Sequence, residues 1–66
     1  MMNYALQNEM RSCINDMRQT AKYLDEAADK LEASLQGLGK MNICKRMRSD
    51  ANEYRKAANE MGKALY

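Results

Sequence analysis

MRQTAKYLDEAADKLEASL, residues 17–35, and MRSDANEYRKAANEMGKAL, residues 47–65, are the two stretches that decide the fold of this chain. In each stretch, Ala and larger apolar residues recur at alternating intervals of four and three. Such positions share one side of an α-helix, so each stretch predicts a helix with an apolar seam. The seam positions are Met17, Ala21, Leu24, Ala28, Leu31 and Leu35, and then Met47, Ala51, Tyr54, Ala58, Met61 and Leu65.

Flanking residues set the expected ends of the two helices. Capping and turn signals place the first helix over about residues 5–36, a loop over about 37–41 and the second helix over about 42–65. We expect Asn3 and Asn42 to cap the helix starts, and Gly37 to end the first helix. A short connection makes neighbouring helices antiparallel. The prediction is an all-α fold, with residues 1–66 forming one antiparallel helical hairpin with an Ala-rich heptad seam.

Folding the chain at the glycines between the stretches places Ala28 opposite Ala51 and Ala21 opposite Ala58. Facing Ala residues let two helices approach closely. A second row remains uncovered beside the seam, and two thin helices enclose little core in a chain of 66 residues. We therefore expect a homodimer that forms a four-helix bundle. The second row comprises Cys13, Thr20, Ala27 and Ser34 in the first helix, and Ile43, Asp50, Ala57 and Ala64 in the second.

The composition argues against catalysis. The chain has no histidine, no glycine-rich phosphate loop and no nucleophile beside a base, so we expect no enzyme activity, metal, cofactor or small-molecule substrate. It has no apolar run long enough to span a membrane and no apolar leader, so we expect a cytoplasmic protein with reduced thiols. Cys13 and Cys44 fall too far apart in the hairpin for a disulfide. We expect both to pack as small apolar residues, or to meet between copies.

Candidate binding residues are basic and aromatic. Lys40, Lys45, Arg46 and Arg48 lie in a segment without acidic residues and could contact phosphate or an acidic protein. Alternatively, Arg46 and Arg48 pair with Glu32 and other carboxylates across the hairpin. Tyr23 falls off the seam, as do Tyr4 and Tyr66, and could be an exposed contact residue.

The second helix resembles that of the Rop family of plasmid copy-number regulators at Ile43, Cys44, Ala51 and Glu53. This resemblance implies a helical hairpin that dimerises into a four-helix bundle and holds paired RNA loops on its first helices. Arg11, Arg18 and Lys22 would be the basic counterpart of that face here. The chain lacks the phenylalanine of the Rop face, so the resemblance supports the fold more than the function.

Three functions fit these patterns. We expect a non-enzymatic regulatory or inhibitory protein, of the kind that phages and plasmids encode, which binds a host macromolecule, most simply a protein. The alternatives are an RNA-binding bundle like Rop and a purely structural module whose partner is itself.

Overall fold

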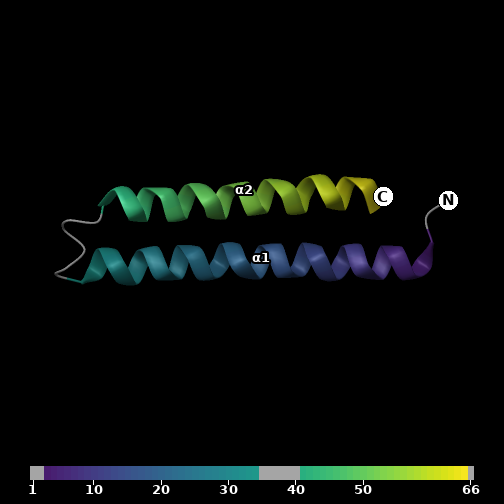
Figure 1. Cartoon of the computed structure of the whole chain (residues 1–66), viewed down its shortest axis with the longest axis horizontal. Coiled ribbons are helices and arrows are strands. Elements are labelled where there is room, and N and C mark those ends of the chain that lie inside the picture. The colour runs from purple at the N-terminus through teal and green to yellow at the C-terminus, as the bar shows by residue number, and fades with distance from the viewer. Residues whose placement is uncertain (1–2, 35–40, 66) are drawn as a thin grey trace.

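Two α-helices pack side by side and antiparallel in the computed structural model, which describes residues 3–34 and 41–65. Helix α1 spans Tyr4–Ala33 and helix α2 spans Met41–Leu65 (Figure 1). The start of α1 and the end of α2 lie at the same end, and the Cα trace measures 52 × 14 × 11 Å. The predicted antiparallel hairpin is therefore confirmed, and one copy is a thin rod.

The helix ends match the predicted caps only in part. Asn3 caps α1, because its Oδ1 accepts hydrogen bonds from the amides of Ala5 at 2.7 Å and Leu6 at 3.4 Å. The expected end of α1 near residue 36 is wrong: the helix stops at Ala33, where the Ser34 hydroxyl donates to the Leu31 carbonyl at 2.8 Å. A serine hydroxyl competes for backbone groups in this way and favours a helix end.

The second predicted cap is wrong. Helix α2 already begins at Met41, so Asn42 lies inside its first turn rather than before it. Methionine is a good helix former, and its helical conformation moves the start by one residue. The predicted helix-ending residue Gly37 and the rest of segment 35–40 lie outside the described residues.

The buried core is a double row of small side chains. All four seam alanines have an exposed fraction of 0%. The larger seam residues that the structure describes are only partly buried, and Tyr54 is 41% exposed. Two helices that touch along one line leave longer side chains standing beside the contact rather than within it. The buried residues, seven apart in each helix, are Ile14, Ala21 and Ala28 in α1 and Cys44, Ala51 and Ala58 in α2.

Each buried alanine separates two kinds of neighbour. An α-helix turns about 100° per residue, so positions three before and four after a buried residue fall on one side of it. Around Ala51 these positions hold Arg48 and Arg55, whereas Met47 and Tyr54 occupy the complementary positions on the other side. Ala21 has the same arrangement in α1, with Arg18 and Asp25 on one side and Met17 and Leu24 on the other. The hairpin therefore has one charged face and one apolar face.

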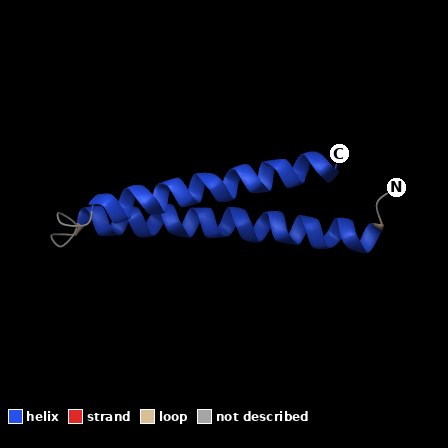
Figure 2. Cartoon of the chain, turned by 45° about the horizontal axis from the view of Figure 1, so that its top comes forward, coloured by secondary structure: helices blue, strands red, loops and turns tan. Residues whose placement is uncertain are grey.

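Polar contacts between the helices agree with the predicted register. Arg55 pairs with Asp25, and Arg48 pairs with Asp29 and Glu32. These contacts are spaced along the rod and hold the two helices side by side, and the buried Cys44 thiol reaches the Ala28 carbonyl between them. The two views of the hairpin show the helices running alongside each other (Figures 1 and 2).

Candidate functional site

The apolar face of the hairpin is open to solvent along its length. Leu6 is 48% exposed and Ile43 is 51% exposed, so large aliphatic side chains meet solvent near both ends of this face. The second row contributes smaller residues between them. The members of the apolar face are Leu6, Met10, Cys13, Met17, Thr20, Leu24, Ala27 and Leu31 from α1, and Ile43, Met47, Asp50, Tyr54, Ala57, Met61 and Ala64 from α2.

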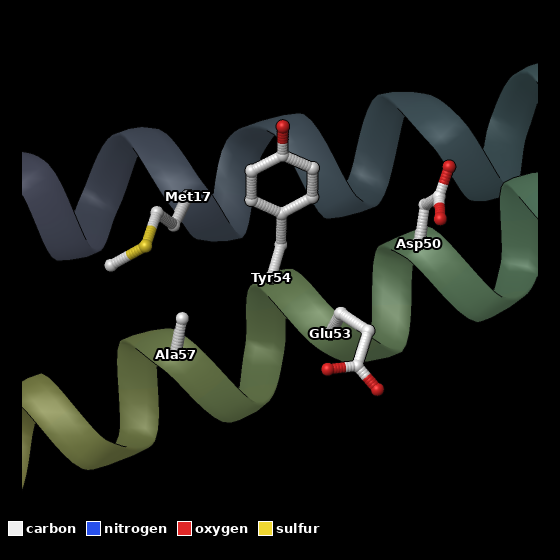
Figure 3. Close-up of a pocket in the computed structure, with 5 residues that line it drawn as sticks. All are labelled: Met17, Asp50, Glu53, Tyr54 and Ala57. Atoms are coloured by element: carbon white, nitrogen blue, oxygen red, sulfur yellow. The ribbon is translucent and has the colours of Figure 1, made fainter.

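Tyr54 lies near the middle of the apolar face. Its ring extends from α2 toward α1, with Met17 and Ala57 nearby (Figure 3). Together with Asp50 and Glu53, these residues line an open hollow of about 440 Å³. An amphipathic ring in such a place suits a contact surface, because the body of tyrosine packs against apolar groups and its hydroxyl keeps a polar partner.

The charged face carries an ion-pair network between the helices. One guanidinium nitrogen of Arg48 lies 2.8 Å from the Asp29 carboxylate and 2.9 Å from that of Glu32. Hydrogen bonds to Asp29 and then Glu32 raise the pKa of Arg48 above its usual range. Arg55, two turns further along α2, pairs with Asp25. These contacts hold α1 and α2 together, so Arg48 serves the hairpin itself.

The residues of the predicted basic cluster differ in their surroundings, so they do not form one binding surface. Arg48 is committed to carboxylates of α1, as the alternative interpretation expected. Lys45 and Arg46 are exposed, and the ion pairs found within residues 3–34 and 41–65 do not include Arg46, so its expected pairing with Glu32 is wrong. Glu32 is taken by Arg48 because that side chain lies next to the buried row, whereas Arg46 points outward. Lys40 lies outside the described residues.

The other predicted binding residues are accessible. Arg11, Arg18 and Lys22 are exposed on α1, and Tyr23 is 60% exposed. Arg18 contacts Asn59 of α2 through a 3.5 Å hydrogen bond. Tyr23 lies on the side of α1 away from α2, because it follows the fully buried Ala21 by two residues, a rotation of about 200°.

The two cysteines have different surroundings. Cys44 is buried and its thiol donates a long hydrogen bond of 3.8 Å to the Ala28 carbonyl. The expectation that Cys13 also packs in the core is wrong for the single hairpin, because Cys13 belongs to the exposed second row. Both thiols are free. The burial of Cys44 within its own hairpin leaves it unable to meet Cys13 of another copy without rearrangement.

Sequence reasoning missed two elements of the charged face. The pair between Asp25 and Arg55 was one, and the contact between Arg18 and Asn59 was the other. The sequence does contain a pattern that indicates the pair between Asp25 and Arg55. Arg55 follows Arg48 by seven residues, and Glu32 follows Asp25 by seven. Opposite charges repeated at heptad spacing beside two facing seams indicate pairing across them.

Metal sites and membrane spans are absent from the part of the chain that the structure describes. Within it, no group of three or more His, Cys, Asp or Glu side chains is arranged to hold a metal ion. Neither α1 nor α2 has the length and apolar character needed to cross a membrane. Comparison of the chain with protein-family models, with curated proteins and with solved structures gave no match.

Proposed function

We propose that this chain is a non-enzymatic regulatory protein that acts by association. Two copies pack their apolar faces together into a four-helix bundle, and the bundle binds and inhibits a host protein through the surfaces that remain outside. The observation that carries the proposal is the apolar face, which runs the length of the hairpin without a partner.

Accessible surface supports the dimer. One copy exposes 5136 Å². A folded monomer of 7.6 kDa is expected to expose about 4300 Å². The difference of roughly 800 Å² equals the area that each partner contributes to a standard protein interface. A second copy supplies a face of the same length and composition, so dimerisation through the apolar face would bury this excess.

Charge outside the apolar face supports a further partner. Lys22, Lys45 and Arg46 are exposed, and none belongs to the ion pairs between α1 and α2 that the structure describes. Accessible basic groups of this kind steer and orient a partner that carries negative charge. We infer that they lie on the outer surfaces of the bundle, since the apolar face faces inward.

Affinity capture from a host lysate tests the proposal. The tagged chain is used as bait with and without nuclease, beside two variants that carry the same substitution at different places. Tyr54→Glu introduces a charge into the apolar face, whereas Tyr23→Glu changes an exposed tyrosine away from it. We expect the unmodified chain to retain a protein after nuclease treatment, and Tyr54→Glu to lose it with the dimer. Tyr23→Glu should keep the dimer but capture less of the protein, because Tyr23 is an exposed candidate binding residue.

Two outcomes would contradict this function. Retained RNA that disappears with nuclease would favour an RNA-binding bundle like Rop. Recovery of the bait alone, as a dimer, from lysates of every candidate host would favour a purely structural module.

A further inference from the structure

A second hollow lies on the charged face, toward the end of the hairpin where α1 begins and α2 finishes. Its volume is about 260 Å³ and it shares no residue with the hollow at Tyr54. Ile14 and Leu65 provide apolar surface, and two arginines and an asparagine provide polar groups. We call it the arginine notch, lined by Arg11, Ile14, Asn15, Arg18, Gly62 and Leu65.

Gly62 borders the open space of the notch. A Cβ atom placed on Gly62 would meet nothing within 4 Å, so the space above this residue is empty. Glycine in the middle of a helix costs about 1 kcal/mol relative to Ala, which makes it an unfavourable choice for helix stability alone. A longer side chain at position 62 would enter the notch from α2, and this provides a means of blocking it.

The two arginines at the notch differ from those that hold the helices together. Arg48 and Arg55 are bound to carboxylates of α1. Arg11 and Arg18 contact only amide oxygens in the described residues, at 3.4 Å from Asn8 and 3.5 Å from Asn59. Each guanidinium has five N–H donors, so both retain unused donors for an external acceptor.

Their spacing places these donors around the apolar surface. Arg11 and Arg18 are seven residues apart, so they lie on the same side of α1 and roughly 10 Å apart along its axis. Ile14 lies between them in the sequence and is 7% exposed. Along α1 the notch therefore presents a cationic group, then an apolar side chain, then a second cationic group. It is complementary to a ligand that presents an anion, an apolar group and a second anion.

We propose that the arginine notch binds an acidic segment of a protein partner, in which two carboxylates flank an aliphatic side chain. Guanidinium groups bind carboxylates with two parallel hydrogen bonds, and the aliphatic side chain fills the hollow over Ile14 and Leu65. Among the described residues that line the notch, none carries an aromatic ring to stack on a base, which favours a peptide over single-stranded RNA. This inference rests on the proposed function, because it names the chemistry of the partner.

Fluorescence anisotropy with four dye-labelled probes tests the notch on the full chain. The probes are a peptide containing Glu-Leu-Glu, matched peptides containing Gln-Leu-Gln and Glu-Gly-Glu, and a short oligouridine. We expect the Glu-Leu-Glu peptide to bind about tenfold more tightly than each of the other three, because only it supplies both carboxylates and the apolar group.

Three variants separate the notch from general charge. Combining Arg11→Gln with Arg18→Gln should weaken Glu-Leu-Glu binding about tenfold, whereas Lys30→Gln with Lys56→Gln removes the same charge from exposed positions outside the notch and should leave it unchanged. Gly62→Leu keeps both arginines and fills the hollow, so it should also weaken binding about tenfold. Circular dichroism establishes that each variant remains helical.

Any of three results would overturn the notch proposal. These are an equal loss of Glu-Leu-Glu affinity in both double variants, undiminished peptide binding by Gly62→Leu, and tighter binding of oligouridine than of the peptide. These outcomes are distinguishable from failure of the proposed function. If lysate capture retains a protein while the Glu-Leu-Glu peptide does not bind, the notch is wrong and the protein-binding function stands. If the peptide binds only through the intact notch, the notch stands whatever the lysate contains.

Discussion

Alanine at four positions sets how closely the two helices approach. The Ala21, Ala28, Ala51 and Ala58 side chains are completely buried, although a methyl group contributes little apolar area. These alanines matter because their side chains are short. A longer side chain at the line of contact would hold the helices apart. The close approach also brings the carboxylates of α1 within reach of the arginines of α2.

Replacing Ala28 with Leu tests this role of small residues. Ala28→Leu adds carbon atoms where none fit, and overpacking should lower the free energy of unfolding by roughly 1–3 kcal/mol. Urea denaturation followed by circular dichroism measures the change. Ala33→Leu is the matched control, because Ala33 is exposed at the end of α1 and should tolerate the longer side chain. Equal stability of both variants would show that the Ala pairs are not in close contact.

Each helix carries its contacts on two faces, and the charged face fixes how α1 and α2 align. Arg48 is the main element, because it bridges two carboxylates one turn apart. The pKa of Arg48 is raised in the folded chain. A group of this kind stabilises the fold below its unfolded pKa and loses that contribution only as pH rises through the folded value. Both values lie far above neutrality, so salt rather than pH will modulate this contact.

Arg48→Gln should lower the Tm at low ionic strength, since two carboxylates lose their cation and the helices lose an alignment contact. The loss should shrink at about 1 M salt, where the Debye length is only ~3 Å. Lys56→Gln removes an equal charge from an exposed pair within α2 and should change the Tm much less. Thermal denaturation at low and high salt measures the effect. A Tm drop for Arg48→Gln that is the same in both salts would contradict an electrostatic role.

At the scale of the whole molecule, the hairpin is a rod with an apolar face left open. Of its large apolar side chains in the described residues, only Ile14 is nearly buried, and the rest are partly or well exposed. A core built from four methyl groups, one thiol and a single isoleucine removes little apolar surface from water. The single hairpin therefore gains modest stability, and a second copy would add a larger apolar contact than the hairpin makes within itself.

Stability should accordingly depend on chain concentration. We expect the Tm to rise as the chain concentration increases from about 5 to 500 µM, since mass action favours the dimer. Tyr54→Glu should abolish this dependence and sediment as a monomer, because it places a charge within the apolar face. Tyr23→Glu should behave like the unmodified chain. A Tm independent of concentration, with monomeric sedimentation of the unmodified chain, would rule out the bundle.

Much of the fold followed from local pattern. The spacing of Ala and apolar residues predicted both helices, the antiparallel hairpin and the burial of all four alanines. The helix ends were less predictable, because Ser34 at the end of α1 and Met41 at the start of α2 each have several conformations open to them. The sequence predicted that the candidate binding residues are basic and aromatic side chains. Residue spacing fixes which side of α2 Arg46 and Arg48 occupy, but it does not fix which carboxylates of α1 lie within reach, so the division between internal pairs and free groups was only one of two alternatives.

The sequence by itself determined helix content, the seam and the antiparallel hairpin, since these depend on residue spacing along a regular helix and on the place of the turn. Tertiary structure decided which side chains meet. It assigned Arg48 and Arg55 to carboxylates of α1, left Cys13 outside while burying Cys44, and opened a notch between Arg18 and Gly62. These outcomes depend on the distance and rotation between two helices, which no single helix specifies.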